Sequence, residues 1–189
     1  EPYKIFTASQ AAIDYCNMKK FKKILLVVPD SEMKQDFSCF DLTDKDPDAI
    51  VLGDMGPLFN FQLLNKLFVK VMGGCQIVAM HKNGYWMASD GLRMDLGAFV
   101  AAIEYASGKS AIIMGKPDVN FFKMATIGWK CPHNFIYMIG DDINVDILGA
   151  KNAGLNTILV KTGKFRDDIL ASSKINPDYI IESIADLPN

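Results

Sequence analysis

The sequence predicts an α/β fold in which short parallel strands alternate with helices. Two observations support this prediction. Apolar segments of strand length recur along the chain, and segments with apolar residues at helical spacing lie between most of them. Strands that alternate with helices pair in parallel and are joined by right-handed crossovers. The functional residues of such sheets gather at the carboxyl ends of the strands.

The first half of the chain reads as a compact α/β unit. We expect strands at residues 3–7, 23–28, 49–52 and 76–80, and helices at residues 10–18 and 60–71. Thr7 or Ser9 can cap the first of these helices, and Gly73 with Gly74 ends the second. The polar segment 31–48 is predicted to hold a helical turn at most. The aromatic, glycine-punctuated segment 81–93 is predicted to form a hairpin or a loop.

The second half of the chain is more regular. We expect strands at residues 111–114, 135–139, 157–160 and 179–181, and helices at residues 95–107, 120–127 and 143–153. Lys116 follows the first of these strands and Asp141 follows the second. Both residues should therefore lie at the carboxyl edge of a parallel sheet.

Length, charge and cysteine content narrow the class of protein. The 189 residues suit one domain, or one with a smaller insertion. The net charge of −2 argues against a nucleic-acid partner. Apolar runs such as residues 24–28 are too short to span a membrane, so no membrane partner is expected. The chain has no CxxC pair, which favours reduced thiols in a cytoplasmic protein over disulfides or zinc. The four cysteines of the chain are Cys16, Cys39, Cys75 and Cys131.

Three carboxylates concentrate after the strand at 135–139. Asp141 and Asp142 are adjacent, and Asp146 lies four residues beyond Asp142, on the same helical face. Like charges this close are unfavourable unless a cation or hydrogen-bond donors compensate them. Mg²⁺ takes carboxylate oxygens together with waters and substrate phosphate. The alternative is that Asp141 or Asp142 caps the following helix. The combination of three carboxylates favours a metal site.

Lys116 lies between Gly115 and Pro117, directly after an apolar strand. Its compact ammonium group suits a phosphate or a nearby carboxylate. A solvated surface lysine is the alternative interpretation. Together with the acidic turn at the same sheet edge, Lys116 indicates a site for an anion and a metal ion.

Other candidates are weaker. Residues 53–56 lack the GK[ST] ending of a phosphate-binding loop. His81 and His133 have no partner at metal-ligand spacing. Asp90 is expected in a turn, with a substrate contact as the alternative. Residues 162–164 can line the same sheet edge or form a plain turn.

Three motifs in order carry a family resemblance. The strings MGKP (114–117), YMIGDDINVDILGAKNAG (137–154) and TILVKTGKFR (157–166) resemble the third and fourth motifs of the haloacid dehalogenase-like (HAD) phosphatases. The resemblance is to the subgroup with a large α/β cap, and it extends over almost the whole chain. It implies a Rossmann-like parallel-sheet core, incomplete at its N-terminus, formed by residues 1–19 and 94–189. Residues 20–93 would form the inserted α/β cap.

The resemblance also implies a mechanism. In this family an aspartate attacks phosphorus to give an aspartyl-phosphate, and Mg²⁺ holds the phosphoryl oxygens. By motif position, Lys116 would steady the nucleophile and the phosphoryl charge, and Asp141 would ligate Mg²⁺. Asp142 and Asp146 would support the metal or its waters.

The sequence departs from the family pattern in one respect. The nucleophile motif hhhhDxDGT and the second, Ser/Thr-containing motif are not found, and in relatives they would precede Glu1. Residues 1–189 alone are therefore expected to be inactive. A non-catalytic HAD-fold protein that binds a partner or a phosphorylated ligand is the alternative. A receiver domain fits less well, because its acidic pair precedes its lysine, whereas Lys116 precedes Asp141.

Substrate choice would come from the cap. Tyr85, Trp86 and Asp90 are the candidate contacts to a small phosphorylated compound, a phosphoamino acid or pyrophosphate. A loop that merely covers the core is the alternative. The resemblance also implies a homodimer through the cap, for which the apolar helix at 60–71 is the candidate surface. Packing on the cap's own sheet is the other role of that helix.

Overall fold

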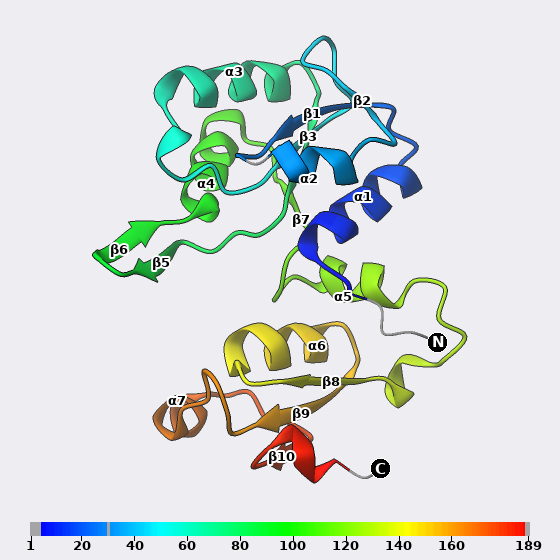
Figure 1. The fold of residues 1–189 in the computed structure, drawn as a ribbon, viewed down its shortest axis with the longest axis vertical. Coiled ribbons are helices and arrows are strands. Elements are labelled where there is room, and N and C mark those ends of the chain that lie inside the picture. Colours follow the sequence, from blue (N-terminus) through cyan, green and yellow to red (C-terminus); the bar gives the residue numbers. More distant parts are fainter. Residues whose placement is uncertain (1–4, 30, 188–189) are drawn as a thin grey trace. The chain divides into compact units, whose positions relative to one another are not determined.

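The computed structural model describes residues 5–29 and 31–187 and divides into two compact units, Glu1–Gly115 and Lys116–Asn189 (Figure 1). In each unit a parallel sheet is combined with helices, which confirms the predicted α/β fold. No described helix is long and apolar enough to cross a membrane.

The first unit is built on a five-stranded parallel sheet with the strand order β2-β1-β3-β4-β7. Its strands are β1 (Lys23–Val27), β2 (Asp41–Leu42), β3 (Ala49–Leu52), β4 (Gln76–Ala79) and β7 (Ile112–Ile113). In the register, Leu52 of β3 pairs with Val27 on one side and with Ala79 on the other. All four residues of β3 are buried, as expected for a central parallel strand covered on both faces.

The described residues of this unit form the helices α1 (Ala8–Met18), α2 (Ser31–Asp36), α3 (Phe61–Met72) and α4 (Leu96–Ser107). Polar side chains start three of them, because the first amides of a helix lack internal partners. Thr7 accepts from the Gln10 amide before α1, Asn60 caps α3, and Asp95 caps α4. A 3₁₀ turn (Gly56–Leu58) precedes α3.

One hydrophobic core joins α3 and α4 to the sheet. Leu67 of α3 and Leu96 of α4 are fully buried with Ile50, Leu52 and Ile77 of the strands. An antiparallel hairpin, β5 (Tyr85–Ala88) and β6 (Gly91–Met94), precedes α4, as one of the two forms predicted for segment 81–93.

The second unit holds a three-stranded parallel sheet with the order β10-β9-β8. Its strands are β8 (Tyr137–Gly140), β9 (Asn156–Val160) and β10 (Tyr179–Ile181). Its helices are α5 (Val119–Thr126), α6 (Leu148–Asn152) and α7 (Asp167–Ser172), with a π-helical turn (Ile143–Ile147) and 3₁₀ turns (His133–Phe135 and Ile184–Asp186). Phe122, Ile136, Ala150 and Leu155 form one small core, and Ile143, Ile147 and Leu159 form another.

Several predicted elements differ from the observed ones. In the expected strand at 3–7, residues 3 and 4 lie outside the described residues, and residues 5–7 form no strand, since Thr7 caps α1. The strand expected from residue 135 starts at Tyr137, because a 3₁₀ turn occupies the residues before it. Segment 31–48 contains α2 and the short β2, which is more than a single helical turn.

The division into units differs from the expected domain boundaries. Residues 95–107 were expected with the core, but Leu96, Val100 and Ile103 of α4 are buried in the hydrophobic core of the first unit. Strand β7 pairs with β4 of the same sheet. The first unit therefore continues to Gly115, beyond the expected cap boundary at residue 93. The assignment of a cap and a core to this chain stays a prediction.

Candidate active site

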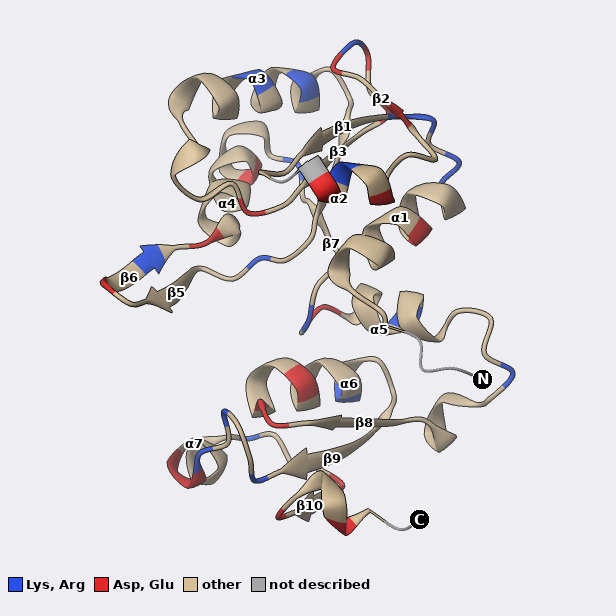
Figure 2. Ribbon diagram, viewed as in Figure 1, with Lys and Arg blue, Asp and Glu red and all other residues tan. Residues whose placement is uncertain are grey.

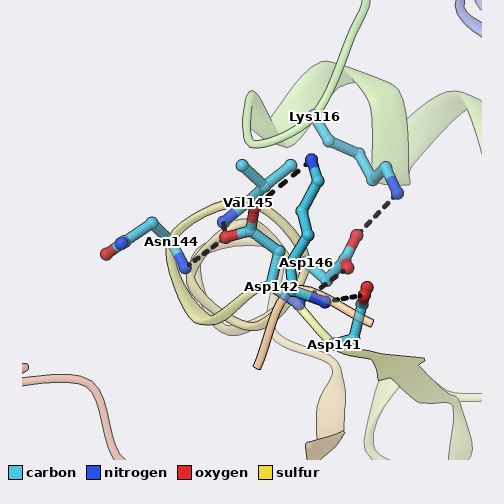
Figure 3. A network of polar contacts seen from close by, with 7 residues as sticks. Lys116, Asp141, Asp142, Asn144, Val145 and Asp146 are labelled. Carbon is cyan, nitrogen blue, oxygen red and sulfur yellow. Dashed lines mark hydrogen bonds and ion pairs between the residues drawn. The ribbon is translucent and has the colours of Figure 1, made fainter. Parts of the chain in front are cut away.

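The acidic turn follows β8 directly, and its second carboxylate caps the helical turn (Figure 3). Asp142 Oδ1 accepts hydrogen bonds from the Asn144 amide at 3.0 Å and from the Val145 amide at 3.1 Å. These amides have no partner within the helix, and their dipoles favour a carboxylate. The capping role considered for Asp142 is therefore present.

A π-helical turn brings Asp146 back to the end of β8. The Asp142 carbonyl accepts from the amides of both Asp146, at 2.8 Å, and Ile147, at 3.3 Å. Asp146 Oδ2 in turn accepts from the Asp142 amide at 3.3 Å, and Asp146 is only 5% exposed. A Cβ atom on Gly140 would lie 2.4 Å from the Asp146 Cβ, so this close packing requires glycine at the end of the strand.

Lys116 also contacts this turn, but not from the same sheet edge. It follows β7 of the five-stranded sheet, whereas Asp141 follows β8 of the three-stranded sheet, so the prediction that both lie at the edge of one sheet is wrong. Its Nζ donates a hydrogen bond to Asp146 Oδ1 at 2.6 Å, and the side chain of Lys116 is 37% exposed. A charge-assisted bond of this length holds both groups in place. The ammonium group has further donors, so it can also bind an anion from solvent.

The Asp141 carboxylate is held by the segment between β9 and α7. Its Oδ2 accepts a hydrogen bond from the Lys164 backbone amide at 2.7 Å. Within residues 5–29 and 31–187, no contact is described for the other oxygen, Oδ1. The Lys164 ammonium lies 3.8 Å from Asp142 Oδ2, so both adjacent carboxylates face this loop.

A cavity of about 220 Å³ opens beside these groups. Its polar walls are the acidic turn and the segment that leads to α7, and its apolar wall comes from β9 and α7. Figure 2 shows the acidic turn after β8 and the basic residues between β9 and α7 in the same unit. The lining includes Asp141, Asp142, Asn144, Lys164, Arg166 and Leu159.

The candidate substrate contacts of the hairpin lie in the first unit. Tyr85 is 69% exposed and Trp86 45% exposed. Asp90 is paired with Arg93, whose guanidinium lies 2.6 Å from the carboxylate. Arg93 also stacks over the Trp86 ring at 6.0 Å, and both residues line a cavity of about 610 Å³ together with Asp54.

Comparisons with known proteins agree on one family. A family model described as HAD-hydrolase-like matches residues 113–187. The haloacid dehalogenase-like hydrolase domain-containing protein 2 of Bos taurus is 40% identical over 174 residues, which cover 92% of this chain. This chain belongs to the HAD-like hydrolases. It spans 65% of the length of the Bos taurus relative.

Two further HAD-like relatives are named as phosphatases. The phospholysine phosphohistidine inorganic pyrophosphate phosphatase of Xenopus laevis is 35% identical over 150 residues, covering 77% of this chain and 55% of the relative. A mutant of the thermostable p-nitrophenylphosphatase from Bacillus stearothermophilus has a similar solved structure, with a TM-score of 0.83 and 26% identity. That similarity covers 100% of this chain and 74% of the other.

HAD membership implies a magnesium ion, and few carboxylate oxygens of the acidic turn are available to bind it. The described residues contain no group of three or more His, Cys, Asp or Glu side chains placed to hold a metal. Asp142 uses Oδ1 for capping, and Asp146 uses both oxygens for hydrogen bonds. Asp141 Oδ1 is the oxygen that fits, because Mg²⁺ in phosphate enzymes needs only one or two protein carboxylates. The ligand roles of all three residues stay predictions.

Two groups that contact the candidate residues are not predicted from the sequence. Arg93 faces Trp86 in the hairpin register, and a strand pattern can reveal such a pair only once the register is known. The Lys164 amide is a backbone group, so residue type carries no signal for it. Residues 162–164 were considered as edge or turn, and the structure brings Lys164 to Asp141.

Proposed function

We propose that the protein is a Mg²⁺-dependent phosphohydrolase that acts on small phosphorylated compounds. The observation that carries this proposal is the 2.6 Å contact between Lys116 Nζ and Asp146 Oδ1, beside Asp141. It fixes a cation on the acidic turn that also carries Asp141, whose Oδ1 has no described contact. A phosphoryl group in transfer needs both kinds of charge compensation.

Lys116 binds the phosphoryl oxygens in this proposal. An ammonium held in advance needs no reorganisation when negative charge develops on the phosphoryl group. Asp146 is a positioning residue, because it is buried and fixes the ammonium from one side. The remaining donors of Lys116 point to solvent or substrate, since its side chain is 37% exposed.

Asp141 is the proposed Mg²⁺ ligand of this chain through Oδ1. The ion, when bound, supplies Lewis-acid polarisation of the phosphoryl group. Asp142 supports this arrangement by capping the helical turn, and Asp146 supports it by holding Lys116. These supporting roles differ from direct ligation of the ion by all three carboxylates. The Lys164 amide orients Asp141 through the opposite oxygen.

The covalent route of the family needs an aspartate in an hhhhDxDGT motif, and residues 1–189 contain no such string. We therefore propose that the aspartyl-phosphate forms on a carboxylate supplied from outside these residues. Under this proposal residues 1–189 alone do not turn over phosphate esters.

Substrate selection is assigned to the hairpin of the first unit, acting as the cap. Trp86 offers an apolar face, and Arg93 offers a cation beside it. Asp90 acts through Arg93, with which it is paired, and Tyr85 adds an exposed aromatic ring. The relatives' names point to phosphoamino acids, pyrophosphate or aryl phosphates as the classes to assay.

The test measures phosphate release from p-nitrophenyl phosphate, pyrophosphate and phospholysine, with and without MgCl₂. It compares residues 1–189 with a longer form that adds a segment carrying hhhhDxDGT, from the gene or from a relative. We expect Mg²⁺-dependent turnover from the longer form only. Lys116→Met should lower its kcat/KM at least about 100-fold, the order expected for a lost charge-stabilising group.

Lys151→Met is the matched control. Lys151 also pairs with an aspartate, at 3.0 Å from Asp178, but it lines no part of the site. It should keep full turnover. Turnover by residues 1–189 alone would overturn the proposed dependence on an outside nucleophile. An inactive longer form that still binds phosphate would favour the non-catalytic alternative.

A further inference from the structure

Residues 162–164 hold the carboxylate of Asp141 from the end of β9. The Lys164 amide donates to Asp141 Oδ2 at 2.7 Å. This bond lies opposite Oδ1, so it fixes the carboxylate by one oxygen and leaves the other for a ligand. A backbone donor is more rigid than a side chain, because it loses no rotamer freedom on binding.

Gly163 makes this approach possible for two separate reasons. Its φ is +57°, in the left-handed region that glycine adopts without strain. A Cβ atom at this position would also lie 1.9 Å from Asp141 Oδ2 and 3.0 Å from its Cγ. The contact is with the end of a side chain, so the carboxylate would rotate away rather than the backbone move.

We propose that Gly163 and the Lys164 amide are positioning elements for Asp141, and that their loop sets the orientation in which Asp141 meets a divalent cation. This inference rests on the proposed function for the identity of the cation. A larger residue at 163 would displace the carboxylate from the Lys164 amide. The loop is therefore part of the site, although Gly163 has no side chain that could contact a ligand.

Gly154 provides a matched control for the backbone strain. Its φ is +76°, and a Cβ atom there would meet nothing within 4 Å. Gly154→Ala therefore introduces the strain of a left-handed alanine without a contact to Asp141. The difference between Gly163→Ala and Gly154→Ala isolates the contact with the carboxylate.

The first measurement is a double-mutant cycle on thermal stability without metal. It compares the native protein with Gly163→Ala, Asp141→Ala and the double variant, and repeats the cycle with Gly154→Ala. Gly163→Ala should lower Tm more than Gly154→Ala in the native background. In the Asp141→Ala background the two should lower Tm equally, because the hydrogen bond and the clash are already gone.

The second measurement is the affinity for MgCl₂ by isothermal titration calorimetry. Gly163→Ala should weaken Mg²⁺ binding by about 10- to 100-fold, the range for residues that orient a metal ligand. Gly154→Ala should change the affinity by less than about twofold.

The outcomes separate this inference from the proposed function. Equal Tm losses for Gly163→Ala with and without Asp141 overturn the positioning role, and so does unchanged Mg²⁺ affinity in Gly163→Ala. If Gly163→Ala fails to fold, rescue by Asp141→Ala supports the inference and lack of rescue overturns it. The double-mutant cycle can show coupling between Gly163 and Asp141 even if the native protein binds no Mg²⁺. That result supports the positioning role and overturns the proposed metal dependence.

Discussion

Lys116 Nζ lies 2.6 Å from Asp146 Oδ1, and the two residues differ sharply in their burial. The side chain of Asp146 is 7% exposed, whereas that of Lys116 is 37% exposed. The carboxylate therefore depends on the lysine more than the lysine depends on the carboxylate. A buried charge without its partner is costly, while a half-exposed ammonium can be solvated.

This asymmetry predicts a stability effect for Lys116→Met. Loss of the ammonium leaves the buried Asp146 carboxylate with the Asp142 amide alone, which should lower the free energy of unfolding by about 2 kcal/mol. Urea unfolding in the absence of metal measures this loss of unfolding free energy. Lys161→Met is the control, since its partner Glu182 is 76% exposed and the free energy of unfolding should barely change. Similar losses for both variants would contradict the prediction.

The cap of the helical turn predicts different results for two substitutions of Asp142. Asp142→Ala removes the acceptor of the Asn144 and Val145 amides and should lower the free energy of unfolding by about 1 kcal/mol. Asp142→Asn keeps an acceptor oxygen and should stay within a few tenths of a kcal/mol. Chemical denaturation of both variants checks the difference.

Asp142→Asn also separates capping from metal ligation. The substitution should leave Mg²⁺ affinity within a few-fold of native if Asp142 only supports the turn. A loss of Mg²⁺ binding with unchanged stability would instead restore the direct ligand role predicted from the sequence.

Asp178 links stability to pH in the second unit. A hydrogen bond from the buried Thr157 hydroxyl, at 2.7 Å, is the main cause that lowers the pKa of Asp178, and Lys151 adds to it. A lowered pKa in the folded state means that the ionised form stabilises the fold above the ordinary pKa of 3.8. This contribution is lost as the pH falls below that value and through the folded pKa.

Asp178→Asn should therefore destabilise the protein at neutral pH, and the difference from native should shrink below about pH 4. Urea unfolding between pH 3 and pH 7 measures this. Asp168→Asn, on an exposed turn of α7, should show little effect at any pH. A difference for Asp178→Asn that stays constant down to pH 3 would rule out the link.

Thiol reactivity follows burial in the structure, where all four cysteines are free. Burial raises the pKa of Cys16 to about 12, and that residue is 0% exposed. Burial also raises the pKa of Cys75 to about 11. Iodoacetamide at pH 7.5 should label the exposed Cys39 and Cys131 first and reach Cys16 only on unfolding, as mass spectrometry of peptides can follow. Early labelling of Cys16 would contradict this order.

The sequence predicted those parts of the fold that depend on local pattern. Residues 49–52 and 179–181 form strands with the predicted bounds, because each is an apolar run between polar turns. Lys116 and the acidic turn were expected together at the edge of one sheet. Lys116 does contact Asp146, but β7 and β8 belong to different sheets, so the contact has another origin than the one predicted.

The remaining features depend on contacts between distant residues. A helix was expected over 143–153, yet the Asp142 carbonyl accepts from both Asp146 and Ile147 and opens a π-helical turn there. The hydrogen bond from the Lys164 amide to Asp141 joins residues 23 positions apart through a backbone group. Burial of α4 with β3 and β4 set the unit boundary, and apolar spacing cannot tell which sheet a helix will cover.

Helix α3 presents a surface through which we expect the first unit to form a homodimer. Phe61, Val69 and Met72 are 75%, 58% and 57% exposed, and their spacing places them on one face of the helix. The opposite side buries Leu67 and Val71 in the core. Exposed apolar groups gathered on one face are typical of an interaction surface.

We expect light scattering to give twice the chain mass for the native protein and the single chain mass for Val69→Lys/Met72→Lys. Tyr105→Lys is the control, because Tyr105 is 94% exposed and lies on α4 rather than on α3. It should leave the dimer intact. A native protein that is monomeric at high concentration, or equal disruption by both changes, would exclude α3 as the interface. Retained Tm in Val69→Lys/Met72→Lys would show that the change acts on association, since the buried face of the helix is untouched.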